Sequence, residues 1–341
     1  MVTIVAESAK KKGAIFRLPE RKRQRRYSNL ELRGPIKVAR GSMKANLRNA
    51  PNPEVRRQTA LDLEDHWISL DGARMRFLRA GSGPDLLMLH GLLGYSFSWR
   101  YAIPVLAEQA TVHAVDMLGV GFSDRPAGLD GSLAACADRL LRFLDALGIE
   151  SCDLLGTSHG GAVAMMGAAL APERIRRLIL VAPANPWSSN GARLAAFLSS
   201  TAVAPVFLQL ARRSEFMHDY CLRRLYGDTR RIRPGTLDGY SAPFAIPGAY
   251  AHGLAILRTW SQDLAKLKSV LPKIAQIPSL ILWGDQDRAV DPASAEPLKR
   301  QFQQCRLVMY EGVGHLPYEE VPDEFNRTVA EFLAEGVPVS A

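Results

Sequence analysis

Ser158 lies at the centre of a pentapeptide, Gly156-Thr157-Ser158-His159-Gly160, in which glycines flank a potential nucleophile. An apolar run, residues 152–155, precedes the pentapeptide, and a run of small residues, 161–170, follows it. A G-x-S-x-G pattern between a strand and a helix is typical of a nucleophile elbow, where the serine adopts a strained backbone conformation. Glycines relieve the crowding, and the free N–H groups of the following helix favour a developing negative charge. Ser158 is therefore the candidate nucleophile.

A second group of residues could supply the base and the acid that a serine nucleophile needs. A serine hydroxyl reacts poorly until a neighbouring base removes its proton. His315 follows a strand-like run in Gly312-Val313-Gly314-His315, and Asp287 ends the segment Trp283-Gly284-Asp285-Gln286-Asp287, where another strand-like run breaks into a loop. Each of the three groups follows a predicted strand, and substrates of open α/β sheets bind at the carboxyl ends of the strands. We therefore expect Ser158, Asp287 and His315 to lie at one edge of a parallel sheet.

Each of these assignments has an alternative. Ser158 could be a helix N-cap, although the glycines around it favour an elbow. Asp285 and Asp291 compete with Asp287 for the role of the acid. His90 is expected to brace a neighbouring loop rather than to act as a base. The histidines that belong to none of these motifs are expected to be ordinary core or surface residues: His66, His113, His218 and His252.

The elements that must position these groups alternate along the chain. From about residue 65, short apolar runs alternate with helix-like segments, which predicts an α/β architecture with a mainly parallel sheet. The turn Asp71-Gly72 indicates a hairpin at the start of the series. The alternation breaks after Pro183, and a long helical stretch follows before the last strands. The predicted domain bounds are 1–58 for a basic extension, 59–185 and 271–341 for the core, and 186–270 for a helical cap.

The basic character of the chain resides in its N-terminal arm, residues 1–58. The whole chain has a formal net charge of +9, and residues 1–60 hold 16 Lys and Arg against 4 Asp and Glu, so that the remainder has a net charge of −3. The arm could be a tail that touches nucleic acid or anionic lipid, a transit-type presequence, or an inert extension. Because charge runs are usually solvated, we expect a disordered arm with at most weak contact to anionic surfaces and no specific nucleic-acid binding.

The cysteines and the apolar runs indicate the cellular compartment in which the protein is expected. Cys136, Cys152, Cys221 and Cys305 lie far apart, which argues for reduced thiols in a cytosolic protein and against a disulfide framework or a zinc site. The uncharged run 194–211 contains a proline and several polar side chains, and so favours an apolar lid helix over a membrane span. We expect a cytoplasmic protein without a metal or cofactor, with peripheral membrane association as the alternative.

Together the motifs resemble those of the α/β-hydrolase superfamily, from about residue 65 to 336. The resemblance implies a mostly parallel, twisted eight-stranded sheet that is flanked by helices and carries a helical cap insertion. It implies Ser158 as the nucleophile, His315 as base and acid, and Asp287 as the group that orients the imidazole. The superfamily pattern places the acid three residues after the glycine of W-G-x-x-D, which favours Asp287 over its neighbours. The matching segments are H-G-L-L-G at 90–94, D-M-L-G-V-G-F-S at 116–123, G-T-S-H-G-G at 156–161, W-G-D-Q-D at 283–287 and G-V-G-H at 312–315.

The resemblance also implies an oxyanion hole beside the nucleophile. The backbone N–H groups of Leu92 and His159 would form it, and the His159 ring is a candidate for lining the pocket. An apolar cap segment would supply a pocket for an acyl chain. The candidate pocket residues are Leu93, Phe197, Phe207 and Leu316.

Serine at the elbow narrows the chemistry of the candidate site. Haloalkane dehalogenases and epoxide hydrolases of this superfamily use an aspartate there, whereas serine suits attack on an acyl carbonyl. We therefore expect a carboxylesterase- or lipase-like enzyme that cleaves a small, largely apolar ester or related acyl substrate through an acyl-enzyme intermediate. A non-catalytic binding protein on the same fold is the alternative from another class, because fold alone does not define function.

A meta-cleavage-product C–C hydrolase is the alternative within the superfamily. Enzymes of that type use the same triad and a helical cap, and Arg223 or Arg224 could hold a substrate carboxylate. In that family a tryptophan usually follows the catalytic histidine, and the oxyanion loop is richer in glycine. This chain has Leu316 and Leu92-Leu93 at those places, which favours the ester hydrolase.

Overall fold

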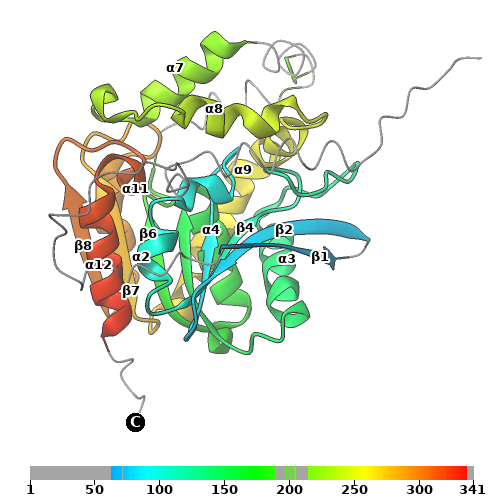
Figure 1. Ribbon diagram of the computed structural model, residues 1–341. Helices are drawn as coiled ribbons and strands as arrows, with labels where there is room; N and C mark the ends of the chain where they lie inside the picture. Colours follow the sequence, from blue (N-terminus) through cyan, green and yellow to red (C-terminus); the bar gives the residue numbers. More distant parts are fainter. Residues whose placement is uncertain are drawn as a thin grey trace, which may run out of the picture. The chain divides into compact units, whose positions relative to one another are not determined.

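The strands form at the apolar runs that the sequence predicts, and they assemble into one sheet (Figure 1). β1 and β2 form the predicted hairpin, β2 pairs antiparallel with β4, and all other neighbours are parallel. The strand order is β1-β2-β4-β3-β5-β6-β7-β8, which confirms the predicted mostly parallel, eight-stranded α/β-hydrolase architecture. The computed structural model describes residues 63–70, 72–188, 197, 200, 203–204 and 214–335. The strands are β1 (Glu64–Leu70), β2 (Ala73–Ala80), β3 (Asp85–Leu89), β4 (Thr111–Asp116), β5 (Cys152–Thr157), β6 (Ile175–Val181), β7 (Ser279–Gly284) and β8 (Cys305–Tyr310).

Helices cover both faces of the sheet, because alternate residues of each central strand point to opposite sides. In β3, Leu87 and Leu89 face one apolar core, whereas Leu86 and Met88 face a second. The α-helices are α2 (Ile103–Leu106), α3 (Leu133–Ala146), α4 (His159–Leu170), α7 (Glu215–Leu225), α8 (Thr236–Ser241), α9 (Ala251–Val270), α10 (Ala295–Lys299), α11 (Pro317–Glu320) and α12 (Pro322–Ala334). The 3₁₀ helices are η2 (Ser96–Trp99), η3 (Pro172–Arg174), η4 (Thr229–Arg231), η5 (Ala242–Ala245), η6 (Leu271–Ile274) and η7 (Pro292–Ser294).

The two apolar cores are filled by different helices. The first core receives the apolar stripe of α3, together with α4 and the end of α9, and the second receives α2 and α12. The α3 stripe follows the 3.6-residue helical period. Gly148, with φ of 65°, follows α3 at the point where the sequence predicts a stop. The motifs of the predicted site follow the ends of β3, β5, β7 and β8.

The chain between β6 and β7 forms a helical insertion, which we define as residues 214–270. In Figure 1 its helices α7 and α8 lie above the sheet, and α9 leads back toward it. The backbone N–H of His315 donates to the Leu225 carbonyl at 2.7 Å, and the Tyr95 hydroxyl donates to the Gly239 carbonyl at 2.6 Å. The insertion therefore contacts the loops that carry the predicted site.

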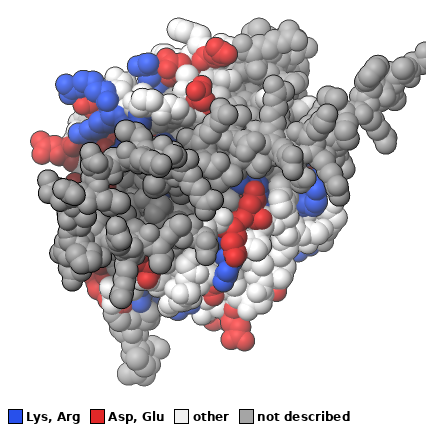
Figure 2. All heavy atoms as spheres, viewed as in Figure 1, with Lys and Arg blue, Asp and Glu red and all other residues white. Residues whose placement is uncertain are grey.

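Charges of both signs lie beside one another around α7 on the face that Figure 2 shows. Arg223 pairs with Asp219 at 2.7 Å, and Arg230 pairs with Asp228 at 2.8 Å. Within the described ranges, no helix is both long and apolar enough to span a membrane. The predicted arm 1–58 lies outside the described residues, as does most of the apolar run 194–211.

Candidate functional site

The backbone at Ser158 has the sharp geometry of an elbow between β5 and α4. Ser158 has φ of 53° and ψ of −121°, a conformation that L-residues rarely adopt. Its N–H donates to the Val181 carbonyl at 2.9 Å, and its carbonyl accepts from the N–H of Ala184 at 2.9 Å. These hydrogen bonds to the last residue of β6 and to the segment after it hold the strained residue in place.

The glycines around Ser158 are required for close backbone approach. A Cβ at Gly160 would overlap the carbonyl oxygen of His90, and one at Gly156 would overlap the carbonyl oxygen of Gly160. A Cβ at Gly161 would come within 2.6 Å of the Pro183 side chain. The turn can therefore be this tight only because these positions lack side chains.

His315 and Asp287 meet at the carboxyl-terminal edge of the sheet, where β8 and β7 end. His315 Nδ1 lies 2.7 Å from Asp287 Oδ2, and both side chains are buried. Asp287 also accepts hydrogen bonds from the Trp283 indole N–H at 3.1 Å and from the N–H groups of Ala289 and Val290 at 2.7 and 3.0 Å. A carboxylate that accepts this many hydrogen bonds is an acceptor only, so Nδ1 donates to it. The other ring nitrogen of His315 is then free to accept a proton.

The competing acids lie elsewhere and hold local turns. Asp285 Oδ1 accepts from the Gly312 N–H at 2.8 Å, and Asp291 accepts from the Ala293 N–H at 3.0 Å at the start of η7. Among the described residues, Asp287 is the acid that contacts His315, and the Ser158 hydroxyl makes no hydrogen bond to that ring. Hydrogen bonds between catalytic groups are often long before substrate binds and shorten in the complex.

The turn that carries Leu92 packs against Ser158 and is held by His90. The Gly94 N–H donates to the Gly91 carbonyl at 3.0 Å, and Leu93 has φ of 59°. His90 Nε2 accepts from the Met117 N–H at 3.1 Å, so Nδ1 carries the proton and donates to the Gly91 carbonyl at 2.8 Å. Burial lowers the pKa of His90, which keeps the ring neutral in this role. We call residues 90–94 the oxyanion loop, after the role that the family resemblance implies for the backbone N–H of Leu92.

Glu320 connects the His315 loop to the helical insertion. Its buried carboxylate accepts hydrogen bonds from the N–H groups of Gly314 at 2.7 Å, Gly227 at 3.0 Å and Asp228 at 3.1 Å. Gly227 and Gly314 pack so closely that a Cβ on either would overlap the other's backbone. No motif in the sequence marks Glu320, because its partners Gly227 and Asp228 lie more than ninety positions away in the chain.

Replacing Glu320 with glutamine is expected to destabilise the protein by about 1.5–3 kcal/mol. The amide NH2 group takes the place of one carboxylate oxygen, and it cannot accept the hydrogen bonds that the backbone N–H groups donate there. Urea unfolding measures this change. Glu324→Gln, at an exposed position of α12, is the matched control and should be nearly neutral. Equal effects of the two substitutions would show that Glu320 does not hold the loop.

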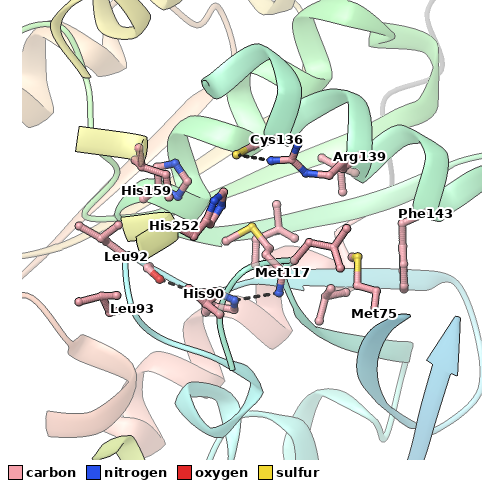
Figure 3. A pocket seen from close by; sticks show the side chains of 17 residues that line it. Met75, His90, Leu92, Leu93, Met117, Cys136, Arg139, Phe143, His159 and His252 are labelled. Carbon is pink, nitrogen blue, oxygen red and sulfur yellow. Dashed lines mark hydrogen bonds between the residues drawn. The ribbon is translucent and has the colours of Figure 1, made fainter. Parts of the chain in front are cut away.

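A narrow cavity lies beside the oxyanion loop, on the side of the sheet covered by α3 and α9 (Figure 3). It has room for roughly one or two water molecules. Leu92, Leu93 and the His159 ring line one end of it, with His252 of α9 beside them. The other lining residues are Met75, Leu89, His90, Gly91, Val115, Met117, Leu118, Val120, Cys136, Arg139, Leu140, Phe143 and Ile256.

The other predicted pocket residues have different environments. Leu316 is buried in the second apolar core, and Phe197 is 60% exposed. Phe207 lies outside the described residues. Of the four candidates, Leu93 lines the described cavity.

The match to a family model agrees with the fold. Residues 84–322 match the model described as alpha/beta hydrolase fold, which is more than half of the chain. The chain therefore belongs to the α/β-hydrolase family.

Relatives of this chain carry several different activities in their names. It is 29% identical over 301 residues to a 2-hydroxymuconate semialdehyde hydrolase of Pseudomonas sp. (strain CF600), covering 84% of this chain and 97% of the relative. It is 27% identical over 282 residues to haloalkane dehalogenase 2 of Mycobacterium tuberculosis, covering 79% and 94%. The crystal structure of a membrane phospholipase A from a bacterium superimposes with a TM-score of 0.70 at 26% identity, covering 82% and 87%. These relatives support a hydrolase and leave its substrate open.

Proposed function

We propose that this protein is a serine hydrolase that cleaves a carboxylic ester, or a related acyl bond, of a small and largely apolar substrate. The observation that carries the proposal is Ser158 on a strained elbow, at the same sheet edge as the hydrogen-bonded pair of His315 and Asp287. Serine rather than aspartate at this position separates the chain from those relatives that form an alkyl ester on an aspartate.

The proposed reaction has two stages, each of which uses His315 twice. In the first stage His315 takes the proton of the Ser158 hydroxyl as its oxygen attacks the carbonyl carbon, and the N–H groups of Leu92 and His159 stabilise the oxyanion. His315 then gives that proton to the leaving alcohol as the acyl-enzyme forms. In the second stage His315 takes a proton from water, which attacks the acyl carbon, and returns the proton to Ser158 as the acid leaves.

The helical insertion would act as the predicted cap in this reaction. Its hydrogen bond from His315 to Leu225 and its contacts with Glu320 support this role, because they couple the insertion to the loop of the base. The side chains of α9 that reach the oxyanion loop, such as His252, would shape the substrate site from above. A cap that excludes water strengthens the electrostatic interactions within a site.

A fluorophosphonate probe tests the proposal directly, since it forms a covalent bond with an activated serine. We expect stoichiometric labelling of the folded wild-type protein at Ser158, identified by mass spectrometry, and no labelling of Ser158→Ala. Ser261→Ala, at an exposed serine of α9, should label like the wild type. A folded wild-type protein that stays unlabelled while a control esterase reacts would contradict the serine hydrolase and favour a binding protein.

A C–C hydrolase of meta-cleavage products is the second candidate function. The similarity to the 2-hydroxymuconate semialdehyde hydrolase, over 97% of that protein, supports it. It requires the same nucleophile and base, so labelling does not separate the two candidates. Turnover of a vinylogous diketone acid, together with inertness toward p-nitrophenyl esters of every chain length, would favour the C–C hydrolase. Preference for short to medium acyl esters would favour the esterase.

A further inference from the structure

The ring of His159 is buried in the cavity of Figure 3 without a hydrogen-bond partner in the described part of the chain. The residue is 2% exposed, and neither Nδ1 nor Nε2 has a hydrogen bond. The ring stacks on Trp260 at 6.2 Å between centroids, a contact that satisfies neither nitrogen. Leaving a buried polar group unpaired costs about 1–3 kcal/mol, and native proteins rarely do so. A group from outside the chain would supply the missing hydrogen bonds.

His252 adds a second unsatisfied imidazole to the same cavity. It is 6% exposed, and its Nδ1 has no partner among the described residues. Its ring is held by packing, because a Cβ on Gly119 would overlap it. Figure 3 shows the His252 ring between His159 and Arg139. Three ring nitrogens of two histidines therefore lack partners in one small space.

Arg139 also lines this cavity, and no carboxylate of the described residues lies within ion-pair distance (4 Å) of its guanidinium. Its guanidinium donates to the Asp130 carbonyl at 2.8 Å and to Cys136 Sγ at 3.2 Å, and among the described residues it forms no ion pair. Burial raises the pKa of the Cys136 thiol to about 11, so this acceptor is neutral. Arg142, one turn along α3, by contrast lies 3.9 Å from the Asp138 carboxylate.

We propose that this cavity is a binding site for a carboxylate group, which pairs with Arg139 and accepts hydrogen bonds from the rings of His159 and His252. An arginine fork and imidazole N–H groups are donors that suit a carboxylate. The room available, roughly one or two water molecules, fits the head of such a group and excludes a long chain. The binding site is inferred from the unpaired ring nitrogens and Arg139, whereas the origin of the bound carboxylate rests on the proposed function. The carboxylate would be either the acid released from the acyl-enzyme or a free carboxylate on the substrate.

Occupation of the site should take up protons. Burial is the main cause that lowers the pKa of His159 to about 3 and that of His252 to about 4, and the positive charge of Arg139 acts in the same direction. Asp130 raises the pKa of His252 by a smaller amount. A bound anion raises both values, so its affinity should increase as the pH falls from 7.5 to 5.5, by at most about tenfold per pH unit for each proton taken up.

Calorimetric titration of the full chain with acetate tests the site without turnover. Ser158→Ala serves as the background, and acetamide serves as the neutral isostere. We expect acetate to bind more tightly at pH 5.5 than at 7.5, with proton uptake that two buffers of different ionisation enthalpy reveal, and acetamide to bind at least about tenfold more weakly. Adding Arg139→Gln should weaken acetate binding by at least about tenfold, whereas Arg142→Gln should leave it unchanged.

Further measurements distinguish the loss of the binding site from the loss of the folded structure. Arg139→Lys keeps the charge and should retain part of the acetate affinity, and thermal unfolding of each variant reports its stability. Equal binding of acetate and acetamide, equal effects of Arg139→Gln and Arg142→Gln, or the absence of acetate binding would overturn the proposal and leave a cavity that holds water only.

Kinetics with the active enzyme distinguish the two sources of the carboxylate. If the substrate carries it, Arg139→Gln should raise KM for a half-ester such as monoethyl succinate and leave KM for diethyl succinate unchanged. If the released acid supplies it, Arg139→Gln should relieve inhibition by acetate in the hydrolysis of a neutral ester. If neither change occurs, the link to turnover is wrong. Failure of the proposed function is recognised separately, because it abolishes fluorophosphonate labelling and leaves the acetate titration intact.

Discussion

Hydrolysis of p-nitrophenyl butyrate by the Ser158→Ala variant is expected to be about 10⁶-fold slower than hydrolysis by the wild type, a loss of the size found when a triad serine is removed. Alanine keeps the Cβ and removes only the oxygen that attacks the carbonyl carbon. His315, paired with Asp287 at 2.7 Å, then has no hydroxyl to deprotonate. The residual rate should reflect the oxyanion hole and substrate binding alone.

The same variant should fold as the wild type does. Among the described residues the Ser158 hydroxyl forms no hydrogen bond, so its loss should change the free energy of unfolding by no more than about 0.5 kcal/mol. Urea unfolding measures this, and Ser261→Ala is the control for both stability and rate. A Ser158→Ala variant that retained a tenth of the wild-type rate would show that another residue is the nucleophile.

Replacing Arg100 with leucine is expected to destabilise the protein by about 3–5 kcal/mol, because it leaves a buried carboxylate without its cation. The two terminal guanidinium nitrogens of Arg100 donate to Glu319, which is 2% exposed and belongs to α11, four residues after His315. Tyr240 and Tyr226 of the helical insertion donate their hydroxyls to the same carboxylate at 2.7 and 3.3 Å. The pair thus joins the core, the insertion and the helix next to His315.

A second substitution separates the loss of the charge pair from the loss of packing. In Arg100→Leu with Glu319→Gln, the amide oxygen still accepts from the tyrosines, and no charge remains buried. This double variant should therefore be more stable than Arg100→Leu alone in urea unfolding. Arg223→Leu, which removes the exposed pair with Asp219, should cost no more than about 1 kcal/mol. Similar losses for Arg100→Leu and Arg223→Leu would contradict the buried pair's role.

The fold was predictable because its signals are local. Short apolar runs separated by turn residues define strands. The observed β3 (Asp85–Leu89) and β7 (Ser279–Gly284) match the apolar runs 86–89 and 280–283 to within one residue at each end. The elbow was predictable for the same reason, since its glycines lie within three residues of Ser158. The serine, the acid and the histidine each follow a predicted strand. Parallel strands bring their carboxyl ends to the same edge of the sheet, so the three groups could be expected there.

The choice of Asp287 needed a family pattern, because three aspartates lie within seven residues. Only coordinates show that Asp285 holds Gly312, that Asp291 starts η7, and that Asp287 contacts His315. Buried polar networks are harder still to predict. Arg100 and Glu319 are separated by more than two hundred residues, and no local sequence pattern distinguishes either of them from an exposed charged residue.

The lining of the cavity beside the oxyanion loop was only partly predictable from the sequence. His159 was a candidate for lining a pocket because it follows the nucleophile, and it does line one. His252 and Arg139 carry no motif and meet His159 only because α9 and α3 pack on the same side of the sheet.

The sequence by itself therefore determined the sheet, the elbow and the family, because periodicity, glycine spacing and motif order are written in neighbouring residues. Only the tertiary structure decided which acid holds His315, which glutamates hold the helical insertion, and which imidazoles remain unpaired. The physical reason is that burial and hydrogen-bond partners arise from residues far apart in the chain, and these set the charge and the chemistry of each group.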